Sequence, residues 1–161
     1  MVDRLVLPDT LRHQLLEHAH SGDPDEVCGI LAGHAGRVER VFPVRNTADQ
    51  VPAQHGVFRD RETGQPGAGR RPVHYYMDPR DQLRVYNEID DLDLELVAYY
   101  HSHTRSEARP SLTDIRLAGD LNVVYVLVSL TETPAVRAWR IEKSDPSDED
   151  GSLTEIAVVD R

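Results

Sequence analysis

Apolar residues recur along the chain at spacings that change between those of strands and those of helices. The short run 4–7 predicts a strand, and a helix is expected from Pro8 to about His20 because four apolar residues share one stripe: Leu11, Leu15, Leu16 and Ala19. Residues 26–33 and 37–44 read as two strands joined by a turn at Gly36, which predicts a hairpin.

The second half repeats this alternation. Strands are expected at 73–77 and 95–100, and a helix begins at Pro79 with Leu83, Tyr86 and Ile89 as its core stripe. A further helix opens at Ser111, and three strands are expected at 122–130, 135–143 and 153–160. This order predicts an α/β fold with a single mixed β-sheet flanked by helices.

Residues 49–72 interrupt the pattern. They show no periodicity and contain four glycines and three prolines. A long irregular segment inside a compact domain is usually functional or disordered. We therefore expect residues 1–161 to form a single domain with a flexible insertion loop at about 49–72.

Composition narrows the class of protein. A chain of 161 residues fits one domain, and its net charge of −10 argues against nucleic acid or an anionic membrane as a partner. No apolar run is long enough to span a membrane, and the first ten residues are too polar for a signal peptide. The single cysteine, Cys28, rules out an intramolecular disulfide and suits a reducing cytoplasm. Lys143 is the only lysine.

The most informative stretch is YYHSHTRSEARPSLTD, residues 99–114. His101 and His103 end an apolar strand and leave the same face, because side chains repeat every two residues. Asp114 lies one turn into the helix that Ser111 opens, where it can face the two imidazoles. Two histidines and one carboxylate could hold a zinc ion and leave one position open for hydrolysis, although Fe(II) or Mn(II) would suit the same ligands.

Simpler interpretations stand beside this one. Ser111 and Asp114 also match a helix capping box, in which neither residue touches a metal. Glu26 begins an apolar strand, where a glutamate is usually just solvated. His13, His18 and His20 are expected on the polar side of the first helix rather than as ligands, and the lone His55 lies in the insertion.

The H-S-H motif, followed by seven residues, a serine, two residues and an aspartate, resembles the signature of the JAMM (MPN-plus) metalloproteases, particularly their small bacterial branch. The resemblance covers roughly residues 4–48 and 73–160. It implies the JAMM fold, in a cytidine-deaminase-like arrangement, and a zinc ion (Zn2+) held by His101, His103 and Asp114. It also implies that Glu26 is the general base, and we expect Ser111 to stabilise the oxyanion.

The resemblance further implies a substrate. The bond cleaved would follow the C-terminal glycine of a ubiquitin-like sulfur-carrier protein with a Gly-Gly tail, and the leaving group would be cysteine. The insertion would help to hold this partner, with arginines 59, 61, 70 and 71 meeting an acidic carrier surface. Arg105 or Arg109 would meet the carboxylate of the cysteine. A homodimer through an exposed sheet edge is compatible with the sequence.

Three alternatives remain open. The same motif would serve an isopeptidase that releases a ubiquitin-like modifier from lysine. A non-catalytic binding module of this family would typically have lost ligands. This chain keeps all five positions of the site, namely Glu26, His101, His103, Ser111 and Asp114. The two histidines and the carboxylate could also form the Fe(II) facial triad of an oxygenase. Such a triad usually takes its third ligand from far along the chain, whereas here all three residues lie within 14 residues. An H-x-H amidohydrolase barrel is excluded by length, because such barrels need about 250 residues.

Overall fold

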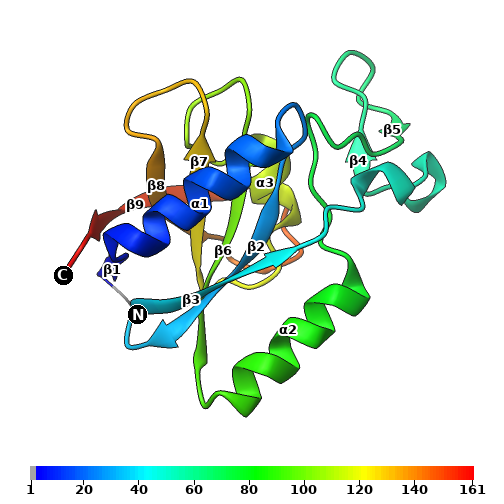
Figure 1. Ribbon diagram of the computed structural model, residues 1–161. Coiled ribbons are helices and arrows are strands. Elements are labelled where there is room, and N and C mark those ends of the chain that lie inside the picture. The colour runs from blue at the N-terminus through cyan, green and yellow to red at the C-terminus, as the bar shows by residue number, and fades with distance from the viewer. Residues whose placement is uncertain (1–2) are drawn as a thin grey trace.

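The computed structural model describes residues 3–161. Its main sheet joins strands in the order β1-β3-β2-β6-β7-β8-β9. The strand bounds are β1 Arg4–Val6, β2 Cys28–His34, β3 Arg37–Val44, β6 Glu95–His103, β7 Val124–Ser129, β8 Val136–Glu142 and β9 Ser152–Val159. The helices are α1 Asp9–Gly22, α2 Pro79–Asp91 and α3 Leu112–Leu117. The predicted mixed sheet with flanking helices is confirmed (Figure 1).

The sheet closes on itself through β1. This short strand pairs in parallel with β9 along its length and with β3 at Val6, so the ends of the twisted sheet meet. An apolar pattern identifies a strand but does not name its partners, so the sequence predicted the strand and missed the closure. The β2–β3 hairpin forms as predicted, and β6 lies in the middle of the sheet between β2 and β7.

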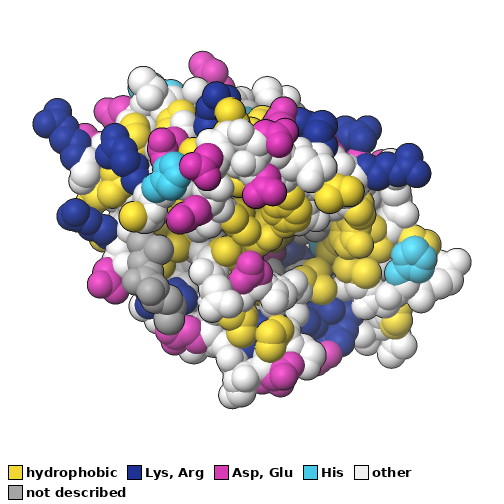
Figure 2. All heavy atoms as spheres, turned by 90° about the horizontal axis from the view of Figure 1, so that it is seen from below, with side chains coloured by type: hydrophobic (Ala, Val, Ile, Leu, Met, Phe, Trp, Pro, Cys, Tyr) yellow, Lys and Arg dark blue, Asp and Glu magenta, His cyan; other side chains and the backbone are white. Residues whose placement is uncertain are grey.

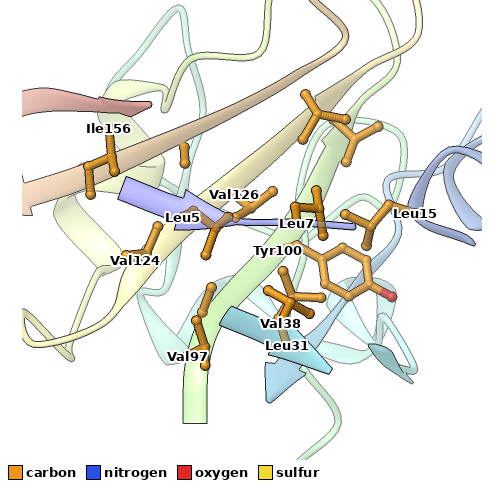
Figure 3. Packing of buried hydrophobic residues seen from close by; sticks show 14 of the residues in the cluster. Leu5, Leu7, Leu15, Leu31, Val38, Val97, Tyr100, Val124, Val126 and Ile156 are labelled. Carbon is orange, nitrogen blue, oxygen red and sulfur yellow. The ribbon is translucent and has the colours of Figure 1, made fainter. Parts of the chain in front are cut away.

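Helices pack on both faces of the sheet. On one face, Leu15 and Ala19 of α1 join the largest core cluster, which includes Leu31 and Tyr100 (Figure 3). On the other face, Val85 and Ile89 of α2 pack against Ile30, Phe42 and Val44. The α1 helix runs two residues beyond the expected end at His20. Within residues 3–161, no helix is long and apolar enough to cross a membrane.

Residues 73–77, predicted as a strand, form only an isolated bridge between Met77 and Asn46. The Asn46 side chain satisfies this segment instead: its Oδ1 accepts the Tyr76 N–H, and its Nδ2 donates to the carbonyls of His74 and Glu26. The apolar and aromatic run there is strand-like, but side-chain hydrogen bonds replace a continuous ladder. Asn46 therefore joins this segment to Glu26, which lies just before β2.

The insertion at 49–72 contains local structure. Two 3-10 turns, Ala48–Gln50 and Ala53–His55, precede a two-stranded hairpin of β4 (Phe58–Arg59) and β5 (Pro66–Gly67). Three buried residues form a small cluster of their own: Ala48, Val51 and Phe58. The hairpin extends from one side of the domain (Figure 1). A second connection, the acidic turn (residues 144–151), links β8 to β9.

The three histidines of α1 differ in their exposure to solvent. His13 and His20 are exposed, as predicted. His18 is not a solvated surface residue, because its Nδ1 lies 2.7 Å from the hydroxyl of Tyr100, which α1 covers. This half-buried contact lowers the pKa of His18 through desolvation. The helical pattern placed His18 near the polar side, but the sheet beneath α1 reaches far enough to contact it.

Candidate metal centre

The two histidines of β6 and the aspartate of α3 meet at one point. Nε2 of His101 lies 3.3 Å from Nε2 of His103, and each lies 3.1 Å from Oδ2 of Asp114. Both histidines are buried. Register explains the placement: β6 pairs with β2 and β7 on its two sides, so its last residues end in the interior of the sheet.

Capping and ligand geometry coexist at Asp114. The N–H of Asp114 donates to Ser111 Oγ at 3.1 Å, and Asp114 Oδ2 accepts the N–H of Ser111 at 2.8 Å. The predicted capping-box interpretation is therefore correct, but the same Oδ2 atom also faces both imidazoles. The cap fixes the carboxylate in the direction of the histidines. Ser111 is exposed, and because its oxygen only accepts in the cap, its proton stays free to donate.

The neighbours of each histidine fix its ring. Nδ1 of His103 lies 2.8 Å from the carbonyl of Glu107, to which it donates. In the neutral ring, Nε2 then carries the lone pair, and this atom faces Asp114 Oδ2. The ring of His101 stacks on Tyr75, with centroids 4.1 Å apart. The sequence offered no sign of this tyrosine contact, because the segment that carries it was expected to belong to the sheet.

These atoms fit a small cation. Three ligand-type atoms, two ring nitrogens and one carboxylate oxygen, lie 3.1–3.3 Å from one another. Ligands at about 2.0–2.1 Å in a tetrahedral zinc site are roughly 3.3 Å apart. The residues therefore fit zinc in both chemistry and spacing. The contact of His103 Nδ1 with the carbonyl of Glu107 is of the kind that usually orients a metal-binding imidazole.

Glu26 completes the cluster from β2's side. A carboxylate oxygen of Glu26 and one ring nitrogen of each motif histidine lie within 4.8 Å of one another. Glu26 is buried, and its backbone is held between Arg71 and Asn46. Burial, followed by the charge of Asp114, raises the pKa of Glu26 to about 8. A buried carboxyl beside a ligand set is suited to carrying a proton.

The pKa values of Asp114 and the two histidines likewise depend on burial and on the neighbouring charges. Burial alone would raise the pKa of Asp114, but the charges and hydrogen bonds of His101 and His103 hold it far below its usual range. Burial lowers the pKa of His101, whereas at His103 the effect of burial is outweighed by the hydrogen bond and charge of Asp114, which raise the pKa. The cluster therefore holds an ionised carboxylate in a buried place.

Cys28 shares the Glu26 face of the sheet and behaves as buried filler. It is fully buried, and its thiol donates to the carbonyl of Val44 at a distance of 3.4 Å. Burial, followed by the charge of Glu26, raises the pKa of this thiol. A nucleophilic cysteine needs a lowered pKa, so Cys28 does not have that character.

A cavity of about 550 Å³ opens beside Asp114. Its lining is mainly aromatic and aliphatic, with Phe58 from the insertion and Tyr75, Tyr76, Tyr99 and Tyr125 from the domain. Figure 2 shows hydrophobic side chains gathered around a hollow on one face of the molecule, in keeping with this lining. The sequence motif located the candidate metal ligands but not this cavity, which long-range packing creates.

Other predicted residues lie outside the cluster. His55 is exposed on a 3-10 turn of the insertion. Arg105 and Arg109 are exposed, and the guanidinium carbon of Arg109 lies 5.4 Å from the ring centre of Trp139. Trp139 is buried, as expected for a core residue, and its indole N–H donates to Ala108 in the loop after the histidines.

Known proteins are similar to this chain in sequence. The profile described as "Prokaryotic homologs of the JAB domain" matches residues 8–142. The "CysO-cysteine peptidase" of Mycobacterium tuberculosis (strain ATCC 25618 / H37Rv) is 36% identical over 159 residues, covering 96% of this chain and 89% of that protein. The "Desampylase" of Haloferax volcanii is 30% identical over 142 residues, covering 84% of this chain and 88% of that protein.

A solved structure shares the fold over almost the whole chain. The solution structure of protein DSY2949 from Desulfitobacterium hafniense superposes with a TM-score of 0.69 at 28% identity, covering 96% of this chain and 91% of that one. The chain therefore belongs to the family of prokaryotic homologs of the JAB domain, and it is a hydrolase of the JAMM type.

Proposed function

We propose that this hydrolase is a zinc enzyme that cleaves the amide bond after the C-terminal glycine of a ubiquitin-like sulfur-carrier protein and releases cysteine. The observation that carries the proposal is the triangle of His101, His103 and Asp114, whose facing atoms lie 3.1–3.3 Å apart, with Glu26 buried beside it. The similarity to the mycobacterial CysO-cysteine peptidase supports the choice of substrate and a role in cysteine biosynthesis.

His101, His103 and Asp114 would hold the zinc ion. When bound, zinc supplies Lewis acidity, which polarises a carbonyl and makes water a better nucleophile at neutral pH. Glu26 takes a proton from the attacking water on its carboxylate and later gives it to the leaving amine. Its buried position and raised pKa match a group that must hold that proton between the two steps.

Ser111 stabilises the transition state. Its hydroxyl oxygen accepts the N–H of Asp114, so its proton is available to the oxyanion that forms on the scissile carbonyl. The cap also fixes the direction of the hydroxyl relative to the ligand Asp114. One serine therefore orders the helix and donates to the reacting group, and the two roles use different parts of the hydroxyl.

The cavity beside Asp114 would receive the carrier tail. Its aromatic lining suits an extended peptide, and a Gly-Gly end is narrow enough to approach a buried site. In the neighbouring segment 73–77, the backbone of Tyr76 is hydrogen-bonded to Asn46 and Thr47 on one side, and an added strand would pair with the segment on the other. The tail would then present its last carbonyl to the metal ligands.

The insertion would contact the body of the carrier. Its hairpin is anchored, because Arg116 of α3 donates to the carbonyl of Val57 at 2.7 Å. Within the described residues, the guanidinium groups of Arg61 and Arg70 form no hydrogen bond or ion pair, so they are available to acidic carrier groups. Reversing both charges should raise KM without lowering kcat, whereas Arg37→Glu at the start of β3 serves as control. An unchanged KM would reject the contact.

Arg109 could meet the carboxylate of the leaving cysteine from the loop after the histidines. Arg109→Ala should then slow turnover of a cysteinyl carrier but not of an isopeptide, which lacks that carboxylate. Unchanged turnover of the cysteinyl carrier would remove Arg109 from this role.

A second candidate function shares every site residue. The Haloferax relative is a desampylase, so an isopeptidase acting on a lysine-linked ubiquitin-like modifier is the alternative. A mass-spectrometric cleavage assay separates the two. The zinc-loaded protein and Glu26→Gln are incubated with a carrier bearing C-terminal cysteine and, separately, with an isopeptide conjugate. Loss of cysteine alone supports the proposal, and cleavage of the isopeptide alone overturns it in favour of the alternative.

A further inference from the structure

Lys143 directly follows β8, and its ammonium group lies among four backbone carbonyls. Nζ is 3.1 Å from the oxygen of Arg116 and 3.0 Å from that of Ala118, both at the end of α3. It is 3.0 Å from the oxygen of Asp148 and 3.3 Å from that of Pro146, both in the acidic turn. An ammonium has three donors and no acceptor, so this group joins the two segments.

The helix that Lys143 contacts is the one that carries Asp114. With only six residues, α3 is too short to be stable by itself. The last carbonyls of the helix lack helical N–H partners, and the Lys143 ammonium donates to two of them. The capping box holds the other end of α3. The position of Asp114 therefore depends on contacts at both ends of one short helix.

The acidic turn packs directly against α3. A Cβ atom on Gly151 would lie 3.1 Å from Cγ2 of Ile115 and 2.8 Å from the carbonyl oxygen of Glu142. Glycine thus lets the turn approach α3 directly. Glu149 of the same turn forms an ion pair with Arg59 of the insertion hairpin. The turn consequently supports α3 on one side and contacts the insertion on another.

We propose that Lys143 is a positioning residue for the metal centre. Its ammonium group holds the end of α3 against the acidic turn, which keeps Asp114 and Ser111 aligned with the two histidines. The inference rests on the proposed metal site and adds to it a residue that touches neither metal nor substrate.

The first test measures zinc affinity by competition with a chromophoric chelator. Lys143→Met keeps the length of the side chain but removes the donors, and it should weaken zinc binding about tenfold, in the range seen when supporting contacts of a metal site are removed. Arg37→Met removes one positive charge from the start of β3 and should leave the affinity unchanged. A Lys143→Met protein that loses thermal stability but binds zinc as tightly as wild type would overturn the proposal.

Chemical rescue separates positioning from general damage. Lys143→Ala leaves the four carbonyls without a donor, and a small alkylammonium ion such as ethylammonium can enter their place. We expect millimolar ethylammonium to restore most of the lost zinc affinity, whereas tetramethylammonium, which has no N–H, should not. Equal effects of the two ions would contradict the assignment.

A measurement on wild type does not depend on any variant folding. Because the chain has one lysine, acetylation with an amine-reactive ester modifies only Lys143 and the α-amine. If Lys143 supports zinc binding, zinc must in turn protect Lys143. Zinc should slow acetylation of Lys143 several-fold while the α-amine reacts at the same rate. Equal Lys143 rates with bound zinc would overturn this inference alone, and a wild type that binds no zinc would overturn the metal site as well.

Discussion

Asp114 and Ser111 hold each other at the start of α3, each backbone N–H donating to the other's side chain at 3.1 Å and 2.8 Å. This reciprocal contact points the Asp114 carboxylate at both histidines and leaves the Ser111 proton free. Local helix capping and the metal site therefore depend on the same two side chains. A substitution at Ser111 consequently affects stability and rate through different atoms.

Two substitutions at Ser111 separate these effects. Ser111→Ala should lower kcat by about 10²–10³ through loss of the oxyanion donor, and it should lower the free energy of unfolding by about 1 kcal/mol through loss of the cap. Ser111→Gly should lower kcat equally but destabilise by only a few tenths of a kcal/mol, since glycine is tolerated at this position. Steady-state kinetics and urea unfolding measure the two quantities. If kcat instead falls in proportion to the loss of unfolding free energy in the two variants, Ser111 does not act as the oxyanion donor.

Glu26→Gln tests the general base. The amide cannot accept the proton of the attacking water, so kcat should fall by roughly 10²–10⁴. Because Gln keeps the size of the side chain and the three proposed ligands are untouched, the variant should retain one zinc per chain. Metal analysis of the purified protein checks this. Loss of zinc together with activity would show that Glu26, which lies within 4.8 Å of the histidine nitrogens, is itself a ligand.

The ligand set is tested by metal affinity. Asp114→Asn and His101→Ala should each weaken zinc binding by more than about 100-fold, beyond the range for residues that only support ligands. His55→Ala removes an exposed histidine of the insertion and is the matched control, with unchanged affinity expected. Chelator competition gives all three values. Asp114→Asn with wild-type affinity would mean that Asp114 acts only as a cap.

The sequence predicted more of the site than of its surroundings. His101, His103 and Asp114 lie within 14 residues of one another, and strand parity plus a helix start was enough to bring them together. The stack of Tyr75 on His101 and the cage around Lys143 were missed because they join segments distant in sequence. The closure of the sheet by β1 was missed for the same reason, since pairing depends on where the twisted sheet ends.

Acid sensitivity should depend on His18. Its partial burial lowers its pKa below that of an unfolded histidine, so the folded protein binds this proton less readily than the unfolded chain. The stabilising contribution is therefore complete above the unfolded pKa of about 6.5 and is lost as pH falls through the lower folded value. His18→Gln should reduce the loss of unfolding free energy between pH 7.5 and 5.5.

The control for this prediction lies on the same helix. His13 is exposed, so His13→Gln should leave the pH dependence of stability as it is in wild type. Urea unfolding at both pH values, followed by circular dichroism on metal-free protein, gives the four free energies needed for each comparison. Since both substitutions remove one imidazole from α1, a difference between them reports the Tyr100 contact rather than the charge of the helix. Identical pH slopes for the two variants would show that burial of His18 does not affect its proton binding.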